Sequence, residues 1–145
     1  RVHVVPTRSV PQGLAAMMAF LPHSVDVDML LGGMKDEADS IISGEVTRAV
    51  RDAVVDFGEI QKGDWFGLAD GEITSSSPSL DDALALLLEH LVDPERELVT
   101  LITGDSAPDE TTAFAEQWMS EQRPSVELEV VDGGQPLYPY YLSVE

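Results

Sequence analysis

The chain is short and acidic: its 145 residues include 27 Asp and Glu against 8 Lys and Arg, a formal net charge of −19 at pH 7. This charge repels phosphate groups, which excludes recognition of nucleic acid or an anionic membrane through a basic face, whereas a basic partner, a bound cation or simple solubility would each account for it. The absence of cysteine excludes disulfides, zinc–thiolate sites and a cysteine nucleophile.

The first part of the chain predicts a strand followed by two helices. Residues 2–5 form an apolar run that a proline ends, which is typical of a short buried strand. We expect a turn over residues 7–13 and then a helix over residues 14–20, where apolar side chains recur at helical spacing. Ser24 is the expected N-cap of a second helix. The apolar face of that helix comprises Val27, Leu30, Leu31, Met34, Ala38 and Ile41.

The middle of the chain predicts strands joined by tight turns, and then a helix. Residues 46–55 indicate a partly exposed strand, and Gly-Asp and Asp-Gly steps within residues 60–74 favour hairpins. Residues 75–78, three serines and a proline, are expected to form a loop. Ser79 and Asp82 resemble a capping box, which predicts a helix start. The buried face of this helix comprises Leu80, Ala83, Leu84, Leu87, Leu88 and Leu91.

The last part predicts three strands and one more helix. Residues 97–103 are strongly apolar, residues 126–131 alternate apolar and acidic side chains, and residues 140–144 form a final apolar run. The helix between the first two strands is expected to be capped by Ser106. Its core face would carry Phe114 and Trp118, which are one turn apart.

The order of these elements predicts an α/β fold, with α+β as the alternative. It has a mixed sheet packed with about four helices. We interpret residues 1–145 as a single domain, because the length suits one core. We also interpret the chain as a fragment of a longer protein, since it begins inside an apolar run without an initiator methionine.

Two groups of carboxylates are candidates for contact with a partner. One lies on the exposed side of the predicted second helix, and the other lies at the start of the last helix, where it would complement the helix dipole. The groups are Asp36, Glu37 and Asp39, and Asp105, Asp109 and Glu110. Neither has the spacing of a calcium loop, so we predict no metal site. We also find no complete set of catalytic residues, because the chain has no hydrolase serine elbow and no phosphate-binding lysine loop.

Arg48 and Arg51 are an exception in a chain with few cations. On one strand, three residues apart, they would point to opposite faces of the sheet. We expect at least one of them to pair with a nearby carboxylate. The alternative is that one of them forms a domain or partner contact, for which the guanidinium is well suited.

Four segments, in order, resemble the large subunit of bacterial fatty acid kinase, a member of the dihydroxyacetone-kinase-like family. They are PTRSVPQGLAAM at residues 6–17, GEVTRAVRD at 44–52, IQKGD at 60–64 followed by DG at 70–71, and VDGGQPLYPY at 131–140. The residues that match the family motifs are Thr7, Arg8, Pro11, Gln12, Gly13, Thr47, Arg48, Arg51, Asp52, Gly63, Asp64, Gly133, Gly134, Gln135 and Pro136.

The resemblance implies that this chain is the C-terminal portion of a cytoplasmic subunit, related in fold to DegV proteins. It implies a non-catalytic role, docking the acyl-carrying DegV-type partner through an acidic surface. ATP and magnesium are then expected only in a separate kinase domain, which, with a dimerisation domain, belongs to the same polypeptide. The acyl phosphate made there would supply phospholipid synthesis.

The alternative function is a small DegV-type module that binds a fatty acid or another ligand. Five apolar side chains, Met17, Met18, Phe20, Met29 and Met34, could line an acyl pocket. At helical spacing such residues are more often part of a hydrophobic core, which is the competing interpretation.

Overall fold

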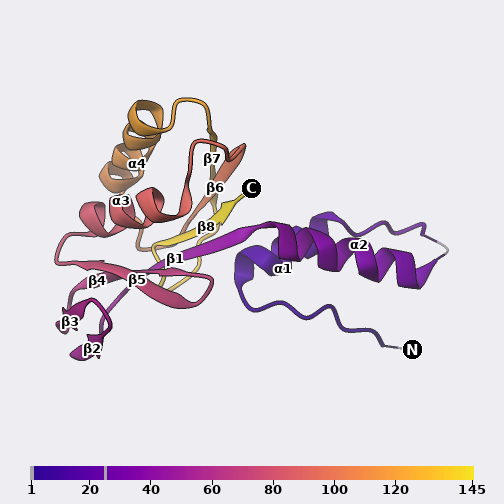
Figure 1. Ribbon diagram of the computed structural model, residues 1–145, viewed down its shortest axis with the longest axis horizontal. Coiled ribbons are helices and arrows are strands. Elements are labelled where there is room, and N and C mark those ends of the chain that lie inside the picture. Colours follow the sequence, from indigo (N-terminus) through magenta and orange to yellow (C-terminus); the bar gives the residue numbers. More distant parts are fainter. Residues whose placement is uncertain (1, 25) are drawn as a thin grey trace.

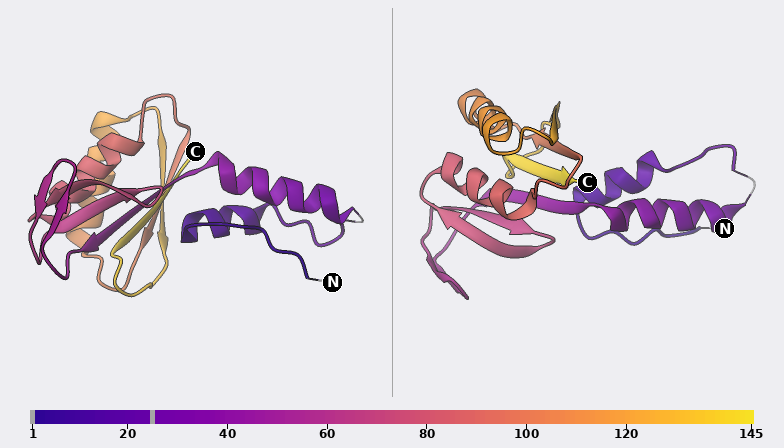
Figure 2. Two further views of the ribbon diagram at one scale, coloured as in Figure 1. Left: turned by 60° about the horizontal axis from the view of Figure 1, so that its bottom comes forward. Right: turned by 45° about the horizontal axis from the view of Figure 1, so that its top comes forward.

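The computed structural model describes residues 2–24 and 26–145, which form an α/β body and a projecting arm of two helices (Figure 1). The arm consists of α1 (Val10–Met18) and α2 (Val27–Ser40), which pack against each other. In the body, α3 (Leu80–Leu91) and α4 (Asp109–Gln122) lie on one face of a sheet (Figure 2). The described residues therefore confirm the predicted α/β fold with four helices and a mixed sheet.

The main sheet has six strands in the order β5-β4-β1-β8-β6-β7. In chain order these are β1 (Ile42–Arg48), β4 (Trp65–Ala69), β5 (Glu72–Ser77), β6 (Leu98–Thr103), β7 (Glu127–Asp132) and β8 (Tyr140–Val144). Neighbours run antiparallel except β6 and β7, which α4 connects as a parallel pair. The last strand, β8, lies between β1 and β6, so it joins the two halves of the sheet. A separate two-stranded hairpin contains β2 (Ala53–Val55) and β3 (Gly58–Ile60).

The hydrophobic core lies between this sheet and the pair α3 and α4. Leu84, Leu87 and Leu88 of α3 are fully buried against core residues of β1, β6 and β8. Burying a leucine side chain contributes about 1.5–3 kcal/mol, so this helix face anchors the body. The helix begins as predicted, because Ser79 Oγ accepts a hydrogen bond from the Asp82 N–H at 3.3 Å.

The prediction of a strand at residues 2–5 is wrong for this chain taken alone. These residues have no regular structure, and Val2 and Val4 are exposed. A strand needs the backbone hydrogen bonds of a neighbour, and within the described residues no strand lies beside this segment.

Both helices of the arm begin at residues other than those predicted. The expected turn over residues 7–13 is wrong in part, because α1 starts at Val10 with Ser9 as its N-cap and ends at Met18. Pro11 is tolerated in the first turn, where backbone N–H groups have no partner in the helix. Asp26, not Ser24, caps α2 by accepting a hydrogen bond from the Met29 N–H at 3.0 Å.

Two predictions around the strands need correction. The expected strand over residues 46–55 is divided: β1 ends at Arg48, and the chain then bends so that the Ala49 N–H bonds the Asp64 carbonyl at 2.8 Å. The expected loop over 75–78 is mostly strand, because β5 continues to Ser77 against β4. Serine is a weak strand former, and pairing with β4 overrides that preference.

The start and the buried face of α4 also differ from the prediction. Pro108 occupies the N-cap position, and Ser106 makes no capping bond. A proline holds the residue before it in extended backbone, so the helix cannot extend back through Ala107. The buried positions of α4 are Thr111, Ala115 and Met119, whereas Phe114 and Trp118 are only half-buried.

The interpretation of the methionines as core residues is wrong at most of the five positions. Met17, Met18, Phe20 and Met29 are exposed on the arm, and Met34 is half-buried. They do not reach the core because the arm projects from the body instead of folding onto it (Figure 1).

Candidate functional site

The arm meets the body beside a polar depression of about 580 Å³. We call it the junction depression and define it by its ionisable lining residues Arg8, Asp70, Glu72, His90, Asp93 and Arg96. These side chains come from the segment before α1, the β4–β5 hairpin, the end of α3 and the loop that follows it. The apolar floor includes Ile42, the first residue of β1, which pairs with Val144 of β8.

Asp70 connects the β4–β5 hairpin to the start of β1. Asp70 and Gly71 have backbone φ angles of +48° and +86°, as a tight two-residue hairpin turn requires. The Asp70 carboxylate accepts hydrogen bonds from the Ser43 N–H at 3.0 Å and the Ser43 hydroxyl at 3.2 Å. The hairpin predicted from Asp-Gly is therefore confirmed, and its turn is fixed against β1 at the edge of the junction depression.

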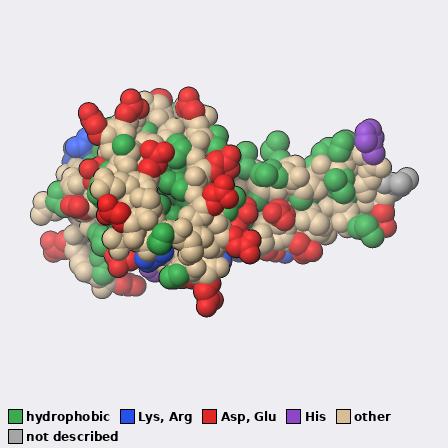
Figure 3. Space-filling model, turned by 90° about the horizontal axis from the view of Figure 1, so that it is seen from above, with side chains coloured by type: hydrophobic (Ala, Val, Ile, Leu, Met, Phe, Trp, Pro, Cys, Tyr) green, Lys and Arg blue, Asp and Glu red, His purple; other side chains and the backbone are tan. Residues whose placement is uncertain are grey.

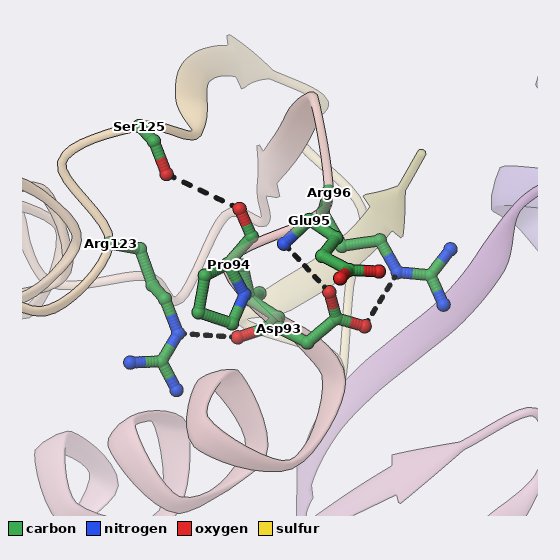
Figure 4. Close-up of polar contacts among 7 residues, drawn as sticks. Asp93, Pro94, Glu95, Arg96, Arg123 and Ser125 are labelled. Carbon is green, nitrogen blue, oxygen red and sulfur yellow. Dashed lines mark hydrogen bonds and ion pairs between the residues drawn. The ribbon is translucent and has the colours of Figure 1, made fainter.

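Asp93 organises the loop on the other side of the depression (Figure 4). Its carboxylate accepts a hydrogen bond from the Glu95 N–H at 2.8 Å and forms an ion pair with Arg96, whose Nε lies 3.4 Å away. From α4 and its end, Arg123 donates to the Val92 carbonyl, and the Ser125 hydroxyl donates to the Pro94 carbonyl at 3.3 Å. These contacts fix the backbone of the loop, in which Glu95 is exposed.

The first predicted carboxylate group lies beside this junction. Asp36, Glu37 and Asp39 are exposed in the last two turns of α2, which leads directly into β1. Asp39 is paired with Lys35, and this hydrogen bond and ion pair raise the pKa of Lys35 above its ordinary value. Asp36 and Glu37 form no ion pair among the described residues. The carboxylates most available to a partner here are therefore Asp36 and Glu37.

The second predicted group lies at the opposite end of the sheet. β8 spans the distance between the two groups: its Val144 pairs with Ile42 beside the α2 end, and its Tyr140 pairs with Thr103, just before Asp105. Asp109 and Glu110 occupy the first turn of α4, where they complement the helix dipole. The structure therefore does not bring the two carboxylate groups together on one surface.

The family-motif residues of the first segment shape the start of α1. The Arg8 N–H donates to the Gln12 side-chain oxygen at 2.9 Å, and the Gly13 N–H donates to the Ser9 carbonyl at 3.1 Å. Thr7 Oγ1 would lie 3.8 Å from a Cβ at Gly13, an ordinary contact. Pro11 is buried in the first turn. This leaves the Arg8 side chain to line the junction depression.

The second and third motif segments form one hydrogen-bonded turn. Arg48 Nε donates to the Gly63 carbonyl at 2.9 Å, and its guanidinium lies 5.5 Å from the centre of the Trp65 ring. Asp52 accepts from the Lys62 N–H at 2.7 Å, and Asp64 accepts from the Gln61 N–H at 2.9 Å. The expectation that Arg48 and Arg51 share a strand is wrong, because Arg51 follows the end of β1. Neither arginine forms an ion pair among the described residues, so the expected pairing with a nearby carboxylate is also wrong.

The last motif segment forms a loop that closes the other end of the sheet. Gln135 Nε2 donates to the carbonyls of Ile102 and Tyr138 at 3.1 and 3.2 Å, and the Gly133 and Gly134 N–H groups both donate to the Thr103 carbonyl. The loop continues through Pro136 to Leu137, whose carbonyl accepts from Thr47 Oγ1 at 3.1 Å. These motif residues maintain the fold and contribute no reactive group.

Sequence reasoning missed Glu45, in the middle of β1. Its neighbours Gly44 and Val46 are buried beneath the helices, so Glu45 faces the opposite side of the sheet, across from Leu68 and Tyr141. Partial burial raises the pKa of this carboxyl above its ordinary value. The sequence signal for this orientation was the alternation of Ile42, Gly44 and Val46 with polar residues. The expected strand began at residue 46, four residues after the start of β1, and so did not include Glu45.

The residues described by the structure hold no cluster of three or more His, Asp or Glu side chains close enough to bind a metal ion. Within the same residues, every helix is too short or too polar to cross a lipid bilayer. The junction depression is lined by carboxylate, guanidinium and imidazole side chains, which are groups that form ion pairs and hydrogen bonds.

The whole chain, residues 1–145, matches the family model that describes the C-terminal part of FakA-like fatty acid kinase proteins. It is also 38% identical over 146 residues to uncharacterized proteins of Staphylococcus aureus strains bovine RF122 / ET3-1, USA300 and NCTC 8325 / PS 47. Each match covers 98% of this chain and 26% of the relative, so the chain spans about a quarter of the length of these relatives.

Proposed function

The chain belongs to the family of C-terminal domains of FakA-like fatty acid kinase proteins, and we propose that it docks the acyl-carrying partner of the kinase. In this proposal the domain takes no part in phosphoryl transfer. It holds the partner so that the acyl carboxylate is phosphorylated by a kinase domain elsewhere in the longer polypeptide, which would bind ATP and magnesium.

The gathering of carboxylates around the junction of arm and body supports this proposal most directly. Asp70, Glu72 and Asp93 line the junction depression together with the cations Arg8 and Arg96, and Arg96 pairs with Asp93. Asp36 and Glu37 add two exposed carboxylates at the end of α2 beside it. Figure 3 shows carboxylates over the body and the base of the arm, while hydrophobic side chains extend along the arm itself. A depression rimmed by charge suits a transient partner with a basic surface.

Electrostatic docking acts mainly on the rate of association and on the choice of partner. Opposite charge on the two surfaces steers the encounter, and salt screens that attraction over about 8–10 Å at physiological ionic strength. We place the docking at the arm end of the sheet, because Asp36 and Glu37 are exposed there and form no ion pair among the described residues. The carboxylates at the start of α4 have a local role there, in complementing the helix dipole.

This proposal is tested by association kinetics of the full-length protein with its purified, lipid-loaded partner. The triple variant Asp36→Asn, Glu37→Gln, Glu72→Gln should bind roughly 10-fold more slowly at low salt, with a smaller effect at high salt. A matched control removes the same number of charges at the other end of the sheet: Asp105→Asn, Asp109→Asn, Glu110→Gln. We expect this control to associate at close to the unmodified rate.

The two triple variants separate the outcomes. Loss of association in the control alone would place docking at α4 and overturn the junction assignment. Normal, salt-independent rates in both variants would mean that the acidity serves solubility and that the docking proposal is wrong. The thermal midpoint of each variant reports whether the folded state is retained. Asp36 and Glu37 are exposed helix positions, where substitutions change stability by about 0.5 kcal/mol or less. Asp109 and Glu110 complement the dipole of α4, so their replacement is expected to cost about 0.3–1 kcal/mol each.

A further inference from the structure

The most unusual surface of the molecule is the apolar face of α1. Val10, Leu14, Met17 and Met18 are exposed and follow helical spacing, so they form one continuous stripe that Leu21 extends. The opposite side of α1 is also apolar, because Pro11, Ala15 and Ala16 are buried. No residue of α1 is charged. Apart from Gln12, whose side-chain oxygen accepts from the Arg8 N–H, α1 has only apolar residues and a glycine, and a helix of this kind is typical of the interior of a larger protein.

α2 and the segment before α1 also expose apolar side chains. Val27 and Met29 are exposed on the first turn of α2. Residues 2–5 contain three valines, of which Val2 and Val4 are exposed and Val5 is half-buried. A proline follows this run, ahead of the N-cap of α1. A near-continuous apolar strand that leads into a helix is the pattern of a strand–helix unit whose strand is buried in a sheet with helices on it.

The body of this chain does not supply that sheet. α1 contacts α2 and the neighbouring ends of β1 and β8, and the arm otherwise projects away from the body (Figure 2). All strands of the main sheet between its edges β5 and β7 are already paired on both sides. Both edges lie away from α1. The strand–helix unit therefore needs a sheet from outside these residues.

Charge and length identify the occupant of this surface. A second copy of the chain would bring together two chains that each have a net charge of −19, which repel each other. A basic partner would find no charge on α1 to recognise. The curated relatives are about four times as long as this chain, and the matched family is the C-terminal part of its proteins. An uncharged, apolar helix face suits a permanent interface within one polypeptide, because such interfaces are more apolar than transient ones.

We propose that residues 2–40 complete a second α/β unit formed with a preceding part of the same longer polypeptide. In this unit, residues 2–5 pair as a strand in a sheet made by that part. The stripe Val10, Leu14, Met17 and Met18 packs on the face of that sheet. The junction depression then lies between two structural units of one polypeptide. This inference is independent of the docking proposal, because it concerns contacts within one chain.

Single-cysteine probes in the full-length protein test this inference. Met18 and Val54 form a matched pair, because they are apolar and expose 84% and 83% of their surface in this chain. We expect the cysteine of Met18→Cys to react with a thiol reagent at least 10-fold more slowly than that of Val54→Cys. Each rate is normalised to its value in denaturant, and the labelled peptide is identified by mass spectrometry. Equal rates would overturn the inference.

Hydrogen exchange of the unmodified full-length protein provides the second measurement, which requires no variant. The amides of residues 2–5 should be protected roughly 100-fold relative to an unstructured peptide, since protection reflects the free energy of local opening. Protection should be present without the acyl-carrying partner and should not change on dilution. Protection that needs the partner, or that disappears on dilution, would assign the surface to that partner or to a second copy and overturn the inference.

Discussion

At the scale of single residues, Gly104 shows how closely two loops approach beyond the end of β6. A Cβ atom at this position would lie 2.3 Å from the Tyr138 carbonyl oxygen and 2.6 Å from that of Gln135. The backbone of residues 135–139 is fixed there, because the Asp105 N–H donates to the Gln135 carbonyl at 3.0 Å and the Gly104 N–H donates to the Pro139 carbonyl at 2.8 Å. The glycine is therefore needed for close approach, and the loop cannot move away without losing these bonds.

We predict that Gly104→Ala destabilises the folded chain by about 1–3 kcal/mol, the usual cost of overpacking. The matched control is Gly33→Ala in α2, where a Cβ would have no neighbour within 4 Å. That control should be neutral or stabilising by up to about 1 kcal/mol, because alanine favours a helix more than glycine does. Urea unfolding followed by circular dichroism measures both. Equal stability of the two variants would contradict the conclusion that Gly104 is required for the close approach of the two loops.

Glu45 is the residue for which the structure predicts a dependence on pH. Burial raises its pKa in the folded chain, so the folded state retains this proton at pH values where the unfolded chain has released it. The stabilising contribution of the protonated form is complete below the unfolded pKa of about 4.3 and is lost as pH rises through the higher folded pKa.

Glu45→Gln should therefore raise the thermal midpoint at pH 7 and leave it nearly unchanged well below pH 4, where the glutamate is protonated in both states. Glu129→Gln on the edge strand β7 serves as the control, because Glu129 is exposed on a strand with a free edge. A gain from Glu45→Gln that is the same at both pH values would show that desolvation of the charge is not its cause.

At the scale of elements, the start of a helix depends on backbone that the pattern of side chains does not reveal. Ser79 and Ser106 both precede an acidic residue by three positions and both predict a cap. Only Ser79 forms one, because Pro108 prevents α4 from starting before Asp109. The same local reasoning placed α2 two residues early, at Ser24 instead of Asp26.

We predict that Ser79→Ala lowers the free energy of unfolding by about 1 kcal/mol, because it removes the cap of the helix that anchors the core. Ser106→Ala should change it by less than about 0.5 kcal/mol, as expected for a surface position without a capping bond. Denaturant titrations of the two variants are directly comparable, since each removes one hydroxyl. A larger loss at Ser106 would show that this serine forms the functional cap.

At the scale of the whole molecule, charge and apolar surface are separated. Figure 3 shows carboxylates over one face of the body and the base of the arm, whereas α1 contains no charged residue. Each proposal concerns one of these two surfaces. A charged rim suits a partner that binds transiently, and an apolar stripe suits a permanent contact within one polypeptide. The kinetic test of the charged variants and the labelling test of the arm address these two surfaces separately.

The amino-acid sequence by itself determined the elements whose signals are local. The leucine spacing of α3 with its cap at Ser79, the apolar run of β6, the final strand Tyr140–Val144 and the Asp-Gly turn of the β4–β5 hairpin were predictable for this reason. The ordered motifs predicted the family, and the family model confirms it. The charge of −19 limited the classes of partner but not their place on the surface.

Only the tertiary structure decided which residues meet. It placed β8 between β1 and β6 and so put the two carboxylate groups at opposite ends of one strand. It also extended β5 through three serines and brought Arg8, Asp70 and Asp93 around one depression. The physical reason is the same throughout. Strand pairing and helix packing depend on contacts between residues far apart in the chain, and a local pattern of side chains contains no information about the partner.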